Sequence, residues 1–520
     1  MEESFDISEL QGVQDLATAK FFLDLLARAA EQQAQTIQQQ TETIAQLTAT
    51  IEALREELAE FKRALLGPKT ERVIPVDREL RENAKRQETP EQRAARLEQT
   101  RQRRAAAKEK RRDEVESEPV PHPCPEACEQ CGLPLESAAE LAPETSEEYE
   151  YVPAKVVRRV HTRQRKVCSC GCFAIGAPPV RVTDGCIYGP GMHAHVVVAK
   201  CLDSIPLERQ SRAFGRTGVS MSPSTLCDLF HRGAWFMQPL ARRILELIAA
   251  STHVNADETS LKVQDKDECR RCYVWDFIAT NEDGFLMVAY RFSADRSGAT
   301  PIEVLGQTTG VLQVDGFTGY NQVTTPDTRS RAGCWAHARR KFFLAIETSP
   351  EEAHTAIDFI REFYEVEYDA VTRKILGSER HLALRRTVTR DAVDRFYEWV
   401  AKTQGRARPK SKLGEALTYV TNQRGPLELF LEDPKIALDN NVSERQLRLI
   451  ALGRKNFLFV GNETAGSNLA INQTIVSTCA ANGINPFDYY ADVLIRTQTH
   501  PVADLDALLP WNWKQLRDRE

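Results

Sequence analysis

At the stretch HVNADETSLKV, residues 253–263, the periodicity of the sequence changes from helical to strand-like. Apolar and polar residues alternate along it well enough for a β-strand, and it follows a segment with helical periodicity. Further strand patterns follow at residues 273–279, 286–292 and 311–314. The last of these runs directly into Asp315 and Gly316. The first three strands are expected to be antiparallel, because only short polar turns separate them.

Three antiparallel strands, a helix at residues 301–305 and a fourth strand ending in an acid match the start of a ribonuclease-H-like fold. From Asp315 to the next candidate acid, Glu444, is 444 − 315 = 129 residues, which is too long for one crossover. A helical insertion at about residues 345–425 would explain that length. Ser349 and Pro350, followed by two glutamates, are a strong helix start.

Glu444 lies in DNNVSERQLRLIALGRKNFLFVG, residues 439–461. Asn441 and Glu444 have the spacing of an N-cap and its capping-box partner. Arg448 shares a helix face with Glu444. The apolar run 457–460 is predicted to be strand-like.

Asp257 in a strand, Asp315 at a strand end and Glu444 on a late helix can converge. Carboxylate oxygens suit Mg²⁺ or Mn²⁺, and two such ions roughly 4 Å apart can catalyse in-line phosphoryl transfer. Each acid also has an ordinary explanation. Glu444 could be simply a helix-capping residue, and Asp315 could be simply a turn former. Asp257 has Glu258 as a rival, although strand alternation points those two side chains to opposite faces.

The N-terminal part predicts one long helix over residues 23–66. Apolar residues occupy the a and d positions of its heptads: Ile37, Ile44, Ile51, Leu58 and Leu65 at a, with Leu47, Leu54 and Phe61 at d. Isoleucine at a with leucine at d favours a parallel two-stranded coiled coil, hence a homodimer or higher oligomer. The alternative is an amphipathic helix that packs on its own chain.

A charged linker, residues 69–118, ends in the basic run 101–112, which is either a solvated charge run or a phosphate contact. Cysteines then predict a zinc-ribbon-like segment with structural Zn²⁺ held by four of Cys128, Cys131, Cys168, Cys170 and Cys172. Residues 186–250 are expected to be helical. The pattern of a helix over 207–214, a turn, and a helix capped by Ser222 or Ser224 fits either a helix-turn-helix or plain helical packing.

Composition sets limits on the class of protein. The 520 residues carry a formal net charge of −6, so nucleic-acid binding must come from local basic patches. The thirteen cysteines favour metal or free thiols over disulfides in a reducing compartment. No apolar run long enough to span a membrane and no signal peptide occur, which predicts a cytoplasmic protein without a membrane partner.

Several segments together resemble the transposases of the insertion sequence 66 family, a DDE-type group. They are ADET around Asp257, QVDGFTGY around Asp315, CWAHARRKF from Cys334, and LDNNVSERQLRLIALGRKNFLF around Glu444. The resemblance spans about residues 60–513 in the same order. It implies a catalytic triad of Asp257, Asp315 and Glu444, a ribonuclease-H-like core, a zipper-like N-terminus, a zinc segment and recognition of terminal inverted repeats. The spacing Cys168-Ser-Cys170-Gly-Cys172 and the residue Phe317 depart from the family pattern.

The sequence therefore predicts a multidomain α/β DNA transposase that cuts the ends of an insertion sequence and joins them to target DNA, with two Mg²⁺ or Mn²⁺ ions in each active site. A non-catalytic DNA-binding regulator and a related two-metal nuclease are the alternatives. Double-stranded DNA is the expected partner, small accessory proteins are possible, and the protein would associate with the nucleoid when bound to DNA. The candidate phosphate contacts are cationic: Arg339, Arg340, Arg445, Arg448, Arg454 and Lys455.

Six regions are expected along the chain. They are a coiled coil (1–68), a linker (69–118), a zinc-ribbon-like domain (119–185), a helical DNA-binding region (186–250), a catalytic domain (251–475) and a C-terminal tail (476–520).

Overall fold

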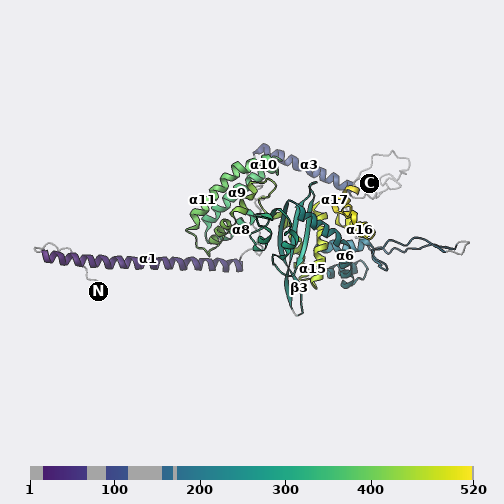
Figure 1. Cartoon of the computed structure of the whole chain (residues 1–520), viewed down its shortest axis with the longest axis horizontal. Coiled ribbons are helices and arrows are strands. Elements are labelled where there is room, and N and C mark those ends of the chain that lie inside the picture. Colours follow the sequence, from purple (N-terminus) through teal and green to yellow (C-terminus); the bar gives the residue numbers. More distant parts are fainter. Residues whose placement is uncertain (1–15, 67–88, 115–154, 168–172, 267, 518–520) are drawn as a thin grey trace, which may run out of the picture. The chain divides into compact units, whose positions relative to one another are not determined.

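Residues 253–332 form a mixed sheet of five strands in the computed structural model of the chain (Figure 1). The structure describes residues 16–66, 89–114, 155–167, 173–266 and 268–517, with only the backbone for parts of the two N-terminal helices. The strand order is β5-β4-β3-β6-β7. The strands are β3 (His253–Gln264), β4 (Cys269–Thr280), β5 (Leu286–Ser293), β6 (Gly310–Gln313) and β7 (Arg329–Ala332). The first three pair antiparallel, whereas β6 and β7 run parallel to β3.

The first four strands and the helix α7 (Ala299–Leu305) confirm the predicted order of elements. The charged run that begins at Asp265 predicts a hairpin turn that includes Cys269 and Cys272, and this prediction is wrong. Both belong to β4, where Cys272 pairs with Leu261 and is fully buried. A hairpin needs only a few residues to reverse, so the second strand can begin at Cys269.

The fifth strand, β7, was not predicted, because Arg-Ser-Arg-Ala looks like surface chain. Arg329 is nevertheless only 1% exposed. Its guanidinium donates to the Thr308 hydroxyl at 2.8 Å and to the backbone carbonyls of Ala249 and Ser251 at 2.7 and 3.0 Å. Burial is tolerated because these acceptors replace the water that the guanidinium loses.

The three helices directly before the sheet in the chain are α4 (Pro190–Cys201), α5 (Leu207–Arg216) and α6 (Pro223–Ala250). The Ser222 hydroxyl caps α6 by accepting from the Thr225 amide at 3.1 Å, which confirms the predicted helix start. Many α6 side chains are buried, from Leu226 to Ile248. Most of α6 is therefore a core helix that packs against β5 and α15 (Glu463–Ala481), rather than a helix exposed for groove binding.

Helix α15 covers the edge of the sheet at β5. Two of its polar side chains, together with that of Asn482 at its C-cap, bond the backbone of alternate β5 residues. Thr474 accepts from the Tyr290 amide at 2.9 Å, Thr478 from Val288 at 3.2 Å, and Asn482 from Leu286 at 2.9 Å. Four helical residues advance about 6.0 Å and two strand residues about 6.6 Å, so the two spacings match. The strand edge is thereby closed to other strands.

The C-terminal helices α16 (Pro486–Arg496) and α17 (Pro510–Arg517) bury most of their aromatic residues, although Phe487 is exposed. Trp511 and Trp513 are 6% and 7% exposed. The Tyr489 hydroxyl donates to the Leu508 carbonyl at 2.7 Å, which ties α16 to the last turn before α17.

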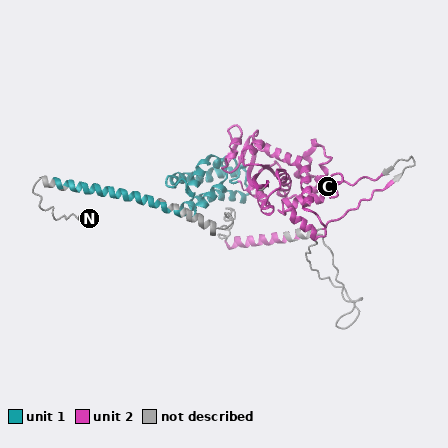
Figure 2. Ribbon diagram, turned by 90° about the horizontal axis from the view of Figure 1, so that it is seen from below, with its two compact units in different colours: residues 1–73, 333–439 teal, residues 74–332, 440–520 magenta. Residues whose placement is uncertain are grey.

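The chain divides into two compact units (Figure 2): Met1–Val73 with Gly333–Asp439, and Ile74–Ala332 with Asn440–Glu520. Residues 333–439 are helical and interrupt the sheet unit between β7 and α14 (Asn441–Phe457). Their main helices are α8 (Trp335–Ala345), α9 (Pro350–Thr372), α11 (Arg390–Gln404) and α12 (Lys412–Asn422). Helix α9 begins at the proline that the sequence marked as a helix start.

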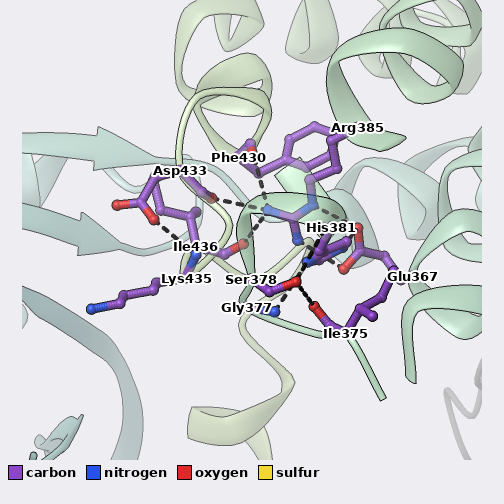
Figure 3. Close-up of polar contacts among 10 residues, drawn as sticks. All are labelled: Glu367, Ile375, Gly377, Ser378, His381, Arg385, Phe430, Asp433, Lys435 and Ile436. Atoms are coloured by element: carbon purple, nitrogen blue, oxygen red, sulfur yellow. Dashed lines mark hydrogen bonds and ion pairs between the residues drawn. The ribbon is translucent and has the colours of Figure 1, made fainter. Parts of the chain in front are cut away.

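A buried arginine organises this helical segment (Figure 3). Arg385 is 1% exposed and forms a two-point ion pair with Glu367, at 2.7 Å for each bond. Its remaining terminal nitrogen donates to three backbone carbonyls between residues 430 and 436. His381 also contacts Glu367, at 3.1 Å. One guanidinium therefore holds the backbone of residues 430–436 against the rest of the helical segment.

The N-terminal half holds α1 (Leu16–Leu66), α3 (Pro90–Glu114) and a small hairpin, β1 (Arg165–Val167) with β2 (Phe173–Ile175). Helix α1 confirms the predicted long helix, and α3 makes part of the charged linker helical. The five predicted zinc ligands, Cys128, Cys131, Cys168, Cys170 and Cys172, lie outside the described residues. Within the described ranges, no helix combines the length and apolarity needed to cross a bilayer.

Candidate active site

Asp257 and Asp315 extend from neighbouring parallel strands. The register pairs Asn255 in β3 with Gln313 in β6, and each aspartate lies two residues beyond its member of that pair. The Asn255 amide donates to the Gln313 side chain at 3.4 Å, so the two side chains meet on one face of the sheet. Because side chains alternate along a strand, Asp257 lies on that same face. Both aspartates are half-buried.

The backbone around Asp315 is held in a tight turn. Asp315 Oδ1 accepts from the Phe317 amide at 2.8 Å. Arg331 in β7 donates through one nitrogen to the backbone carbonyls of Asp315 and Phe317, each at 2.6 Å. The predicted turn role of Asp315 is therefore real, and it leaves the second carboxylate oxygen outside the turn bond.

Helix α14, which carries Glu444, is anchored to β3 beside Asp257. Asn440 is 1% exposed. Its amide nitrogen donates to the Ala256 carbonyl at 2.8 Å, and its oxygen accepts from Asn255, also at 2.8 Å. The helix begins at Asn441, so the N-cap is Asn440 and the predicted capping role of Asn441 is wrong. The Asn440 side chain makes no capping bond, because it bonds β3 instead.

Glu444 lies in the first turn of α14 and its side chain is exposed. The apolar face of the helix, including Leu447 and Ile450, is buried. At the far end of α14, Arg454 donates to the hydroxyls of Thr259 and Ser260 in β3, at 3.0 and 2.9 Å. The helix therefore lies along β3 with its N-terminal turn at the aspartates. Among the residues that the structure describes, no three acidic, histidine or cysteine side chains gather closely enough to hold a metal ion.

The prediction that the run 457–460 is strand-like is wrong for most of its residues. Phe457 closes α14, and Leu458 adopts a left-handed backbone with φ of 65°. Only Val460 pairs with the sheet, through a single bridge to Val263. Short apolar runs do not distinguish a helix end from a strand.

Asp276 is a carboxyl group that the sequence reasoning missed. It lies opposite Asp257 in β4, is fully buried, and accepts from the Asp257 backbone amide at 2.8 Å. Burial, followed by the negative charge of Asp257, raises the pKa of Asp276 well above its usual range. The Asp257 amide and the buried Ser443 hydroxyl, next to Glu444 in the sequence, only partly offset that effect. An acid within the apolar run YVWDFI was the available signal.

Glu258, the rival of Asp257, is engaged elsewhere. Its side chain is 1% exposed. It accepts from the Tyr320 hydroxyl at 2.7 Å and from Arg296 Nε at 2.8 Å. Burial raises the pKa of Glu258, and the bonds from Tyr320 and Arg296 only partly offset that effect.

The candidate phosphate contacts differ in exposure. Arg445, Arg448 and Lys455 are exposed on α14. Arg454 is bonded to β3, as described above. Arg339 is 8% exposed and Arg340 is half-buried, both on α8. The exposed cations of α14 are thus the ones free to meet a polyanion from solution.

Comparison with known proteins gives the class. Residues 185–468 match the family described as "Transposase IS66 family", and residues 474–511 match the "IS66 C-terminal element". Together these matches cover the sheet, α14 and the C-terminal helices. The chain belongs to the IS66 family of transposases, which confirms the resemblance seen in its sequence.

Relatives of similar length occur in Sinorhizobium fredii (strain NBRC 101917 / NGR234). "Uncharacterized protein y4hP" is 30% identical over 429 residues, covering 78% of this chain and 76% of the relative. "Uncharacterized protein y4qI" is 31% identical over 396 residues, covering 72% of each chain. Neither name states an activity.

Proposed function

We propose that this transposase cuts DNA at the ends of an insertion sequence and joins the freed 3′-hydroxyl groups to target DNA, with Asp257, Asp315 and Glu444 as its catalytic acids. One observation supports this most. The register of β3 and β6 brings Asp257, within β3, next to Asp315, just beyond the end of β6, and Asn440 anchors the Glu444 helix at the same place. Membership of a transposase family implies DNA as the substrate.

The sheet unit would be a ribonuclease-H-like core with residues 333–439 as its helical insertion. Three antiparallel strands followed by two parallel ones, in the order β5-β4-β3-β6-β7, support this assignment. The parallel pairing of β3 and β6 stops at Asn255 and Gln313, so the chain leaves β6 at Asp315 beside Asp257 in the continuing strand β3.

The acids would hold two Mg²⁺ or Mn²⁺ ions, since hard carboxylate oxygens are the ligands that these ions prefer. When bound, the ions would activate the attacking oxygen and stabilise the leaving one. Asp315 has an oxygen outside its turn bond, and Glu444 is exposed in the first turn of α14. Among the described residues, these three side chains are not close enough together to hold a metal ion. Glu444 would therefore move toward the two aspartates when the metal ions bind.

The DNA would meet α14 through Arg445, Arg448 and Lys455, which share a helix with Glu444. Terminal inverted repeats and target DNA are the expected duplexes. The cysteines named above would bind structural Zn²⁺, and α1 would join two protomers so that two DNA ends are handled together. Accessory proteins encoded alongside stay a prediction, as does association with the nucleoid.

Strand transfer can be tested directly. Purified protein would be incubated with a pre-cleaved terminal-repeat duplex, supercoiled plasmid and Mg²⁺. Joined products are expected from the native protein and none from Asp257→Asn or Glu444→Gln, whereas Glu303→Gln, a surface control, should act normally. Hydrolysis without joining would favour the nuclease alternative. DNA binding with no cleavage under any divalent ion would favour the regulator.

A further inference from the structure

We propose that Glu258 is a positioning residue that holds the Asp315 turn against β3, and that it is not itself a metal ligand. This role rests on the proposed function, because its purpose is to set the distance between Asp315 and Asp257. The evidence is a set of contacts that leaves neither Glu258 oxygen unused. Glu258 follows Asp257 directly in β3, so groups that bond to Glu258 are held at a fixed position relative to Asp257.

The first contact runs through Tyr320. Its hydroxyl donates to Glu258 Oε2 at 2.7 Å. Tyr320 lies in the short helix η2 (Thr318–Val323) that follows the Asp315 turn, and it is fully buried. Its ring packs edge-on against Trp275 in β4, with 5.6 Å between ring centroids. The hydroxyl and the ring therefore dock η2 on the sheet at two points.

The second contact runs through Arg296. Arg296 Nε donates to Glu258 Oε1 at 2.8 Å. The same guanidinium stacks on the Phe317 ring, 4.1 Å from its centroid. Phe317 in turn donates its backbone amide to Asp315 Oδ1 at 2.8 Å. A continuous path of contacts thus leads from Glu258 to the Asp315 carboxylate.

Arg331 holds the same turn through contacts that do not involve Glu258. Arg331 holds the carbonyls of Asp315 and Phe317, whereas Glu258 holds the Phe317 side chain and Tyr320. A short turn fixed at its carbonyls, at one ring and at one hydroxyl has little freedom. Removing Glu258 would release two of these three restraints together.

The direct test uses hydrogen exchange and metal binding on the full-length protein. Glu258→Gln, Tyr320→Phe and their double variant would be compared with native protein. We expect faster exchange of amides 315–323 in each variant and Mn²⁺ affinity reduced about 10- to 100-fold, the usual effect of losing a group that orients a ligand. Because the two residues share one bond, the double variant should lose little more than Glu258→Gln alone.

Glu303→Gln is the matched control. It removes a surface carboxylate that pairs with Arg291 in the same unit, and it should leave exchange of residues 315–323 and Mn²⁺ affinity unchanged. Tyr320→Phe keeps the buried ring, so it separates the loss of the bond from a failure to fold.

Two outcomes would overturn the proposal. Glu258 would be a direct ligand if Glu258→Gln abolished Mn²⁺ binding while Tyr320→Phe left both affinity and exchange unchanged. It would have no positioning role if neither variant altered exchange of residues 315–323. Failure of the proposed function looks different: Asp257→Asn and Glu444→Gln would then leave Mn²⁺ affinity unchanged, while the exchange result for Glu258 would still stand.

Discussion

At the scale of single residues, buried polar side chains do the positioning in this protein. Asn440 joins the start of α14 to β3, and Glu258 joins β3 to the turn that carries Asp315. Burying either side chain without hydrogen-bond partners would cost free energy, and each one makes two or more hydrogen bonds. The same principle fixes the helical segment, where Arg385 serves four acceptors: Glu367 and three backbone carbonyls.

The Arg385–Glu367 pair predicts how stability depends on pH. Burial alone would raise the pKa of Glu367, but hydrogen bonds from His381 and Arg385 outweigh it and lower the pKa below its ordinary value of 4.5. A lowered folded pKa means that the stabilisation is complete above about pH 4.5 and is lost as the pH falls through the folded value.

Glu367→Gln should therefore destabilise the helical segment by about 3–5 kcal/mol at pH 7, because it leaves a buried guanidinium unpaired. Denaturant unfolding followed from pH 7 to pH 3 should show that difference shrinking below about pH 4.5. A difference independent of pH would contradict the assignment. Glu398→Gln, which changes a carboxylate on exposed α11 surface, is the control.

At the scale of elements, two helices owe their placement to a face of polar residues as much as to apolar packing. Helix α15 satisfies the edge of β5 through Thr474, Thr478 and Asn482. Helix α14 buries one face on β3 and leaves cations on the other. The first arrangement closes a strand edge, and the second leaves a charged surface beside the candidate acids.

Thr478→Val tests the edge-closing face of α15. The substitution keeps the shape but removes the hydroxyl that accepts from the Val288 amide and donates to its carbonyl. We expect a loss of about 1–3 kcal/mol, because both backbone groups become buried without partners. Equilibrium unfolding measures it. Thr464→Val, at an exposed position in the same helix, should change stability by less than about 0.5 kcal/mol.

Arg445→Ala with Arg448→Ala tests the cationic face of α14. If both cations contact phosphates, DNA affinity should fall for all sequences alike, and the slope of log affinity against log salt should become shallower by about 1.8. Fluorescence anisotropy at several salt concentrations gives the slope. Arg242→Ala, an exposed arginine on α6, should leave it unchanged. An unchanged slope in the double variant would place the DNA elsewhere.

At the scale of the whole molecule, the long helix α1 exposes an apolar seam in the single chain. Ile37, Ile44 and Ile51 at the a positions are 58%, 63% and 51% exposed, and Leu47 and Leu54 at the d positions are 57% and 58% exposed. An exposed stripe of this length is typical of a helix that pairs with another copy.

Ile44→Glu with Ile51→Glu should therefore convert a dimer into a monomer, because two charges would face each other in the seam of a parallel pair. Light scattering after size-exclusion chromatography measures the mass. Glu42→Gln, an exposed residue of the same helix, is the control. A native protein that is monomeric at micromolar concentration would refute the coiled coil.

Local patterns in the chain predicted most of the elements in their order. Alternation predicted β3, β4, β5 and β6, the Ser222 and Pro350 signals predicted two helix starts, and the heptads predicted α1. Family motifs identified the class, and the three acids lie on the kinds of element expected for them. These features depend on residues near one another in the chain.

Features that depend on contacts between residues far apart in the chain are visible only in the tertiary structure. Arg329 could be a strand residue only because the carbonyls of Ala249 and Ser251 accept from it. The Asn440 side chain makes no capping bond at the start of α14 because it bonds β3. Asp276 became a buried neighbour of Asp257 only through the β3–β4 register. A polar side chain reads as surface in a sequence, and whether burial is affordable depends on acceptors that the fold brings from elsewhere.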